Sequence, residues 1–199
     1  MRVTKSLALL FPALSLGIAL TAAAESRKVI RLSGDFSFLS DAPLEKIQGT
    51  AEGATAIVYT DLDDLTRTTG TVVVPVASLK TGNSIRDDHL KSSNWLDAAT
   101  YPEIKFTISA VTGVKSEQRG AVLVTTGLVK GIFTLHGVSK ELETPVTVKW
   151  KGDRVKASIS FTVRLGDHAL RGNKGIVGSK VGETIEIKGI LTGRAKDAQ

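Results

Sequence analysis

An acid–base candidate lies in the middle of the chain, where Asp87, Asp88 and His89 follow one another. Carboxylates beside an imidazole are the residue types used in general acid–base and hydrolytic catalysis. Ser84 followed by Asp87 also resembles a capping box, which predicts a short helix over residues 85–92. Adjacent side chains of a helix point in different directions, and capping and the helix dipole explain carboxylates in a first turn. A structural role is therefore predicted for this cluster, with catalysis as the alternative.

Metal and nucleophilic chemistry have few candidates. The three histidines, His89, His136 and His168, lie in separate segments; a barrel could bring them together as a metal triad, but their spacing does not show it. The simpler interpretation has His89 under a lid and His136 in a hairpin turn. The lack of cysteine excludes disulfides, thiolate metal sites and thiol nucleophiles. Motifs of serine hydrolases, phosphate-binding loops and zinc proteases are also missing, so no enzyme, metal or other cofactor is predicted.

A glycine-rich stretch near the carboxyl end is a further candidate. It covers residues 172–182 and carries Lys174 and Lys180, with Arg171 directly before it. Backbone N–H groups and cations of this kind can bind a phosphate or an anionic headgroup. A mobile surface loop without a ligand is the more common reading of such a segment.

The elements that must position these residues are mainly β-strands, because apolar residues recur with a period of two. In residues 154–165, apolar side chains alternate with polar ones throughout. Comparable or weaker alternation occupies residues 28–33, 36–39, 50–60, 69–76, 104–110, 121–127, 129–135, 142–150 and 185–191. About eight to ten strands, separated by turn signals such as residues 135–138, predict an antiparallel barrel or sandwich. The helical segment, with Trp95 after it, is predicted to form a lid on the barrel mouth.

The first 24 residues are typical of an export signal. Arg2 and Lys5 precede an apolar run over residues 7–20, and Ala22 and Ala24 supply a cleavage pattern before Glu25. An uncleaved membrane anchor is the alternative, because the uncharged stretch approaches the length of a membrane span. Residues 25–199 are then predicted to be one domain of ordinary globular composition, 42% hydrophobic over the whole chain. Removing two cations takes the formal charge from +6 to +4, too small and scattered a surplus to predict nucleic-acid binding.

The apolar strand faces leave two interpretations open. A sandwich fills its centre, whereas an eight-stranded barrel can hold one small apolar ligand. Periodicity alone does not distinguish a packed core from a cavity. Gly131 and Gly189, both inside predicted strands, mark either bends of a barrel or room for a ligand.

Two ordered motifs carry a resemblance to a known family. The first comprises SLKTGNSIRDDHL at residues 78–90, WLD at 95–97 and YPEIKF at 101–106; the second is GIFTLHGVSK at 131–140. Together they closely resemble the signatures of the YceI family, and VGETIEI at residues 181–187 is similar to its closing strand. The start differs, since the family often opens with His-Ser-x-Val-x-Phe and this chain has GDFSF at residues 34–38.

The resemblance implies an exported, all-β, lipocalin-like eight-stranded antiparallel barrel with a short helix or lid. It also implies that the elongated apolar cavity takes a polyisoprenoid or fatty-acyl chain. Together with the export signal and the missing enzyme motifs, it predicts a periplasmic, non-enzymatic binding protein, with at most transient membrane contact and a homodimer left open. The alternative is a stress-response or protein-interaction module with a filled core. With Trp95 at the lid, the residues expected to line the ligand are Phe38, Val74, Phe106, Ile108, Phe133, Leu135, Ile159 and Phe161.

Overall fold

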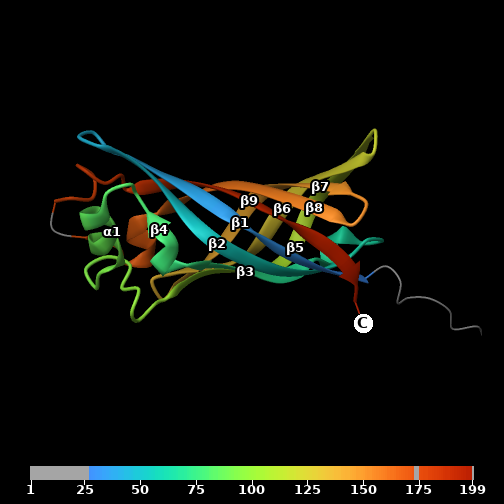
Figure 1. Ribbon diagram of the computed structural model, residues 1–199, viewed down its shortest axis with the longest axis horizontal. Helices are drawn as coiled ribbons and strands as arrows, with labels where there is room; N and C mark the ends of the chain where they lie inside the picture. The colour runs from blue at the N-terminus through green and yellow to red at the C-terminus, as the bar shows by residue number, and fades with distance from the viewer. Residues whose placement is uncertain (1–26, 173–174, 199) are drawn as a thin grey trace, which may run out of the picture.

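Long antiparallel strands dominate the computed structural model, which describes residues 27–172 and 175–198 (Figure 1). The predicted export signal lies outside the described residues. The strands are β1 (Arg27–Asp41), β2 (Lys46–Asp61), β3 (Thr69–Pro75), β4 (Leu79–Lys80), β5 (Glu103–Arg119), β6 (Val122–Leu135), β7 (Val138–Lys151), β8 (Arg154–Arg164) and β9 (Thr184–Asp197). In these ranges, no helix is long and apolar enough to cross a bilayer.

The sheet closes on itself because β1 pairs with two neighbours along most of its length. One edge pairs with β9 and the other with β2, and the remaining order is β8, β7, β6, β5 and β3. The two residues of β4 pair only with β2, beyond the end of β3, so eight strands make the wall. The predicted eight-stranded antiparallel barrel is confirmed.

The alternation in the sequence places one set of side chains inside the barrel. In β8, Val155 and Val163 are 3% and 5% exposed, while Arg154 and Lys156, the two neighbours of Val155, face solvent. Because successive strand residues point to opposite faces, every long strand contributes one apolar row to the interior. The interior is therefore built from all strands together.

Turn residues fix the hairpins. His136 and Gly137 both have positive φ, at 51° and 71°, and form the two-residue connection between β6 and β7. Two-residue hairpin turns favour this backbone because its twist matches that of the flanking strands. The predicted turn at His136 is confirmed.

Short helices occupy both ends of the barrel. At one end lie α1 (Ser84–Lys91) and the 3-10 turns η2 (Val76–Ser78) and η3 (Leu165–His168), and at the other lies η1 (Leu65–Arg67). The N-cap of α1 is Asn83, whose side chain accepts a hydrogen bond from the Arg86 amide. The predicted start was one residue late, because Asn83 provides this cap in place of Ser84.

One seam of the wall is incomplete. β7 and β8 share six residue pairs, from Val146–Ile159 to Lys151–Arg154, against thirteen pairs between β6 and β7. Pairing stops next to Pro145, which has no N–H to offer. Beyond it, the buried Thr144 hydroxyl donates to the Ser160 carbonyl at 2.9 Å. Further along, the Nδ1 of His168 donates to the Val138 carbonyl at 3.0 Å, so side chains replace the missing ladder.

Replacing Thr144 with valine should lower the free energy of unfolding by about 0.5–1.5 kcal/mol, because the seam then loses the hydrogen bond from the buried Thr144 hydroxyl to the Ser160 carbonyl. Urea denaturation at neutral pH measures the change. Thr147→Val, on the outer side of the same strand, is the matched control and should change stability much less. Equal effects of the two substitutions would show that the hydroxyl does not hold the seam.

Candidate functional site

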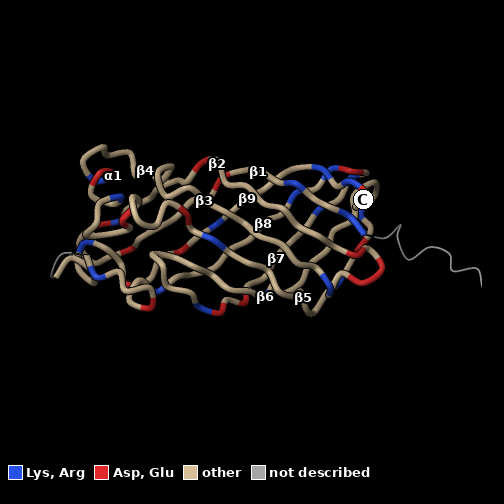
Figure 2. Tube along the Cα trace, turned by 90° about the horizontal axis from the view of Figure 1, so that it is seen from below, with Lys and Arg blue, Asp and Glu red and all other residues tan. Residues whose placement is uncertain are grey.

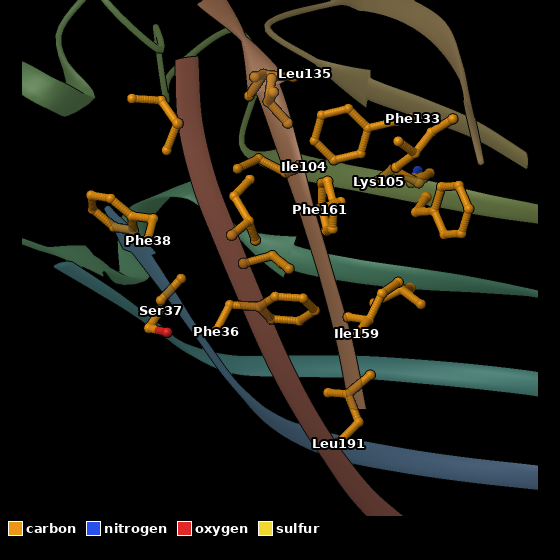
Figure 3. A pocket seen from close by; sticks show the side chains of 18 of the residues that line it. Phe36, Ser37, Phe38, Ile104, Lys105, Phe133, Leu135, Ile159, Phe161 and Leu191 are labelled. Carbon is orange, nitrogen blue, oxygen red and sulfur yellow. The ribbon is translucent and has the colours of Figure 1, made fainter. Parts of the chain in front are cut away.

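One continuous cavity of about 690 Å³ fills the axis of the barrel. Inward-facing side chains of every strand line it, and nearly all of them are apolar (Figure 3). Its volume lies within the range of pockets that hold a single small ligand. The interior is thus a cavity, and the filled core required by the interaction-module alternative is not what this barrel contains.

The predicted ligand-lining residues lie together on the cavity wall. They come from β1, β3, β5, β6, β8 and the segment after α1, and they are Phe38, Val74, Trp95, Phe106, Ile108, Phe133, Leu135, Ile159 and Phe161. Contact between these side chains and a ligand remains a prediction.

An aromatic cluster forms part of the cavity wall (Figure 3). The Phe133 and Phe161 rings meet edge to face, with centroids 5.6 Å apart. On its other side, the Phe133 ring meets the buried His168 ring at 5.4 Å, also edge to face. Such contacts hold the rings in fixed orientations, so this part of the wall has a defined shape.

Glycines in the strands make room for phenylalanine rings. A Cβ at Gly189 would collide with the ring of Phe36, and one at Gly49 would collide with the ring of Phe38. A Cβ at Gly131 would collide with the Thr107 carbonyl and would also lie close to the ring of Phe106. At Gly189 the room left by the missing side chain is taken by the Phe36 ring. This ring therefore lies against the wall, which leaves the axis of the barrel open.

The α1 end forms the mouth of the cavity. Exposed residues line it there, namely Asn83, Ile85, His89 and Lys180. The half-buried Trp95 also lines it and packs against Gly172, where a Cβ would collide with the indole. The segment from α1 to Trp95 therefore lies at the rim, as expected for a lid, but the exposed His89 is not covered by it.

A polar network fixes α1 to this rim. The Arg86 guanidinium binds the Glu45 carboxylate and the Thr81 hydroxyl. Asp87 accepts hydrogen bonds from the Thr81 hydroxyl at 2.6 Å and the Thr81 amide at 2.7 Å. These bonds connect the helix with the β1–β2 turn and the end of β4.

The acid–base cluster is explained by this network. The hydrogen bond from the Thr81 side chain is the main cause that lowers the pKa of Asp87, opposed by burial and assisted by the Thr81 amide, Lys91 and Arg86. A carboxylate held ionised in this way suits an anchor of the helix better than a proton donor. The neighbouring Asp88 and His89 are exposed.

The closed end is capped by η1 and has a different chemistry. Leu65 of η1 and Trp150 of β7 line the cavity there. Two pairs of hydroxyl groups are hydrogen-bonded at this end, Thr60 with Thr68 at 2.7 Å and Ser116 with Thr125 at 3.0 Å. Thr60 and Thr125 are buried and line the cavity, so its deep end carries hydrogen-bonding groups that are already paired.

Two of the three histidines come together, but through backbone contacts. The Nδ1 of His136 lies 3.3 Å from the His168 carbonyl, and the Nδ1 of His168 is used at the β7–β8 seam. Across residues 27–172 and 175–198, no group of three or more His, Asp or Glu side chains could hold a metal ion. In the glycine-rich stretch, Lys180 reaches the mouth, whereas Lys174 lies outside the described residues.

Sequence reasoning missed part of the wall. Phe36 is the clearest case, since it lies beside Phe38 on β1 and its ring points into the cavity (Figure 3). Alternation within residues 36–39 was a usable signal, although the run is short. Trp150 and Ala157 belong to apolar rows of predicted strands, and both line the cavity.

The family is decided by a match over most of the chain. A model of the YceI-like domain matches residues 31–192. The chain belongs to the YceI-like domain family. The resemblance drawn from the two motifs is confirmed, and the matched range contains every strand from β2 to β8 and most of β1 and β9.

Curated relatives of this YceI-like chain include proteins of Pseudomonas. A UPF0312 protein of Pseudomonas savastanoi pv. phaseolicola is 35% identical over 109 residues, which cover 51% of this chain and 52% of that protein. The UPF0312 protein PputW619_0484 of Pseudomonas putida is 34% identical over 113 residues, with the same coverage. The chain thus spans about half the length of the curated relatives it matches.

Solved structures share the fold of this YceI-like domain. Burkholderia cenocepacia BcnA superposes with a TM-score of 0.67 at 22% identity, covering 80% of this chain and 95% of that one. A domain from Saccharophagus degradans, described as polyisoprenoid binding, gives 0.65 at 14% identity and covers 86% and 99%. At these identities the likeness is one of fold.

Asp87→Asn should loosen α1 in a pH-dependent manner. Because the pKa of Asp87 is lowered from 3.8 by folding, its carboxylate stabilises the native state above that value and ceases to do so as the pH falls through the folded-state pKa. We expect a melting temperature a few degrees below that of the wild type at pH 6 and a shrinking difference below about pH 4. Asp88→Asn should change little at either pH. A difference that persists unchanged in acid would contradict the role given to Asp87.

Proposed function

We propose that this YceI-like protein is an exported, non-enzymatic carrier or binding protein that holds one polyisoprenoid or fatty-acyl chain inside its barrel. The observation that carries the proposal is the continuous apolar cavity of about 690 Å³, which reaches the surface at the α1 end. An elongated cavity of this kind matches a long, flexible hydrocarbon better than a compact polar metabolite.

Transfer of a hydrocarbon chain into this cavity needs no reactive group. Removing apolar surface from water is favourable by roughly 25 cal/mol per Å², before the costs of ordering the chain. The wall supplies apolar contacts on all sides, and the aromatic rings of Phe133 and Phe161 are part of it. Binding that depends only on the shape and the apolar character of the cavity is consistent with a carrier and requires no catalytic residue.

The comparisons support the same class of ligand. The domain from Saccharophagus degradans that shares this fold is described as polyisoprenoid binding. Export to the periplasm is supported by the signal-like pattern of residues 1–24, with its basic start and apolar run. In this proposal the predicted wall residues contact the chain, and Trp95 borders its outer end.

A cavity-filling substitution tests the proposal. Ala157→Phe projects a ring into the bore from β8 and should weaken ligand binding at least about tenfold, because a bound chain gives up contacts of two or more methylenes, each worth about 0.8 kcal/mol. Organic extraction of the purified protein, followed by mass spectrometry, measures the bound lipid. Ser158→Phe, the next residue and on the outer face, is the matched control and should keep the wild-type amount.

Two results would overturn the proposal. One is a wild-type protein from its native host whose extracts repeatedly contain no stoichiometric isoprenoid or fatty acid. The other is equal lipid content in Ala157→Phe and Ser158→Phe when both proteins have the wild-type unfolding midpoint.

The two tryptophans measure how far a ligand extends. Trp95 lies at the mouth and Trp150 near the closed end, and both line the cavity. In single-tryptophan variants, Trp150→Phe and Trp95→Phe, a long polyprenol should shift the emission of both proteins, whereas the shorter farnesol should shift only one. Fluorescence titration gives the result. Lack of response to polyprenols, farnesol and fatty acids in both variants would argue against a chain lying along the axis.

A further inference from the structure

Basic side chains that are scattered in the sequence meet on one outer face of the barrel. They belong to four consecutive strands and lie in the half of the barrel that is farther from α1 (Figure 2). We call this the cationic face, and its members are Arg31, Lys149, Lys151, Arg154, Lys156 and Arg194. All six are exposed.

Strand register places these charges directly opposite one another. Lys151 pairs with Arg154, Arg154 with Arg194, and Arg194 with Arg31, so one row of cations crosses β7, β8, β9 and β1. In a second row, Lys149 pairs with Lys156. Like charges on directly opposed residues destabilise a sheet. The face therefore carries an electrostatic cost in the free protein, and an anionic partner would relieve it.

Neutralisation within the face is slight. The Asp153 carboxylate binds the Arg194 guanidinium, and this hydrogen bond is the main cause that lowers the pKa of Asp153. Among the described residues, none of the three lysines of the face takes part in a salt bridge, and neither does Arg31. Their charges are available to an external partner.

Exposed apolar side chains border the cationic face on β2. Ile57 is directly opposite Arg31 and is 41% exposed. Tyr59, farther along the strand, is 53% exposed, and Leu62, directly after the strand, is 45% exposed. A tyrosine beside aliphatic and basic side chains suits the boundary between lipid headgroups and hydrocarbon, because its ring is apolar and its hydroxyl polar.

We propose that the cationic face docks the barrel on an anionic lipid bilayer. The charge is complementary to such a surface, to which each nearby lysine or arginine contributes independently. The face is a convex wall of like charges without an apolar centre, whereas protein interfaces usually contain a desolvated core. Fluid headgroups rearrange beneath the cations and need no matching shape. Docked in this way, the protein holds the mouth at α1 away from the headgroups that bind the face.

Vesicle binding tests the proposal with the full-length mature protein. The wild type should co-sediment with phosphatidylcholine vesicles that contain phosphatidylglycerol, should not bind phosphatidylcholine alone, and should dissociate as salt is raised. The triple variant Lys149→Gln, Lys151→Gln, Lys156→Gln should bind more weakly by about fivefold per charge removed.

The control removes the same net charge elsewhere on the outer wall, in the triple variant Lys130→Gln, Lys140→Gln, Lys188→Gln. It should retain most of the affinity for anionic vesicles. Equal losses in the two triple variants would overturn the assignment, because net charge alone would then explain binding. The assignment would also be overturned if the wild type did not bind anionic vesicles but bound polyglutamate through these lysines. The cationic face would then suit an acidic protein. Extraction of bound lipid should give the same amount from both triple variants, which separates docking from cargo binding.

Discussion

Closure of the sheet through β1 is the constraint on which the remaining structure depends. An empty apolar cavity is unfavourable, since its lining loses contacts that a collapsed core would make. A continuous ring of backbone hydrogen bonds opposes this collapse, because narrowing the bore would require a change of register or the loss of a strand. β1 completes that ring by pairing with β9 on one side and β2 on the other. The cavity, its mouth and its wall residues all follow from this double pairing.

Within the closed wall, residue size determines the shape of the bore. Phe36 lies over Gly189 and Phe38 over Gly49, so large rings cover the wall without blocking the axis. The ends differ in chemistry. Arg86 and Asp87 hold the rim at α1 with charged bonds, whereas the hydroxyl of Thr60 lies at the end closed by η1. From the mouth inward, the cavity therefore has a polar rim, an apolar middle and a few hydroxyl groups at its deep end.

Much of this architecture could be predicted from residue patterns. Alternation identified the inward rows, which is why Phe106, Ile159 and other expected residues lie on the cavity wall. Period two tells which face is buried but not whether the centre is filled, so the cavity itself required the three-dimensional closure. The cationic face was missed for a related reason. Lys151 and Arg154 are near in sequence, but Arg194 and Arg31 join them only through the register of distant strands.

The incomplete seam between β7 and β8 gives the barrel an uneven mechanical response. In a tube under outward pressure, hoop tension is the same around the circumference, and the joint with the least reinforcement yields first. Six residue pairs and the side-chain bonds of Thr144 and His168 hold this joint, whereas thirteen and eleven pairs hold its neighbours β6–β7 and β8–β9. The short β3 is held by five pairs to β2 and six to β5, so it forms a second weakly joined part of the wall. Outward strain on the wall would therefore concentrate along the β7–β8 seam, on the side of the mouth, and along the short ladders of β3, while the circumference elsewhere keeps its diameter.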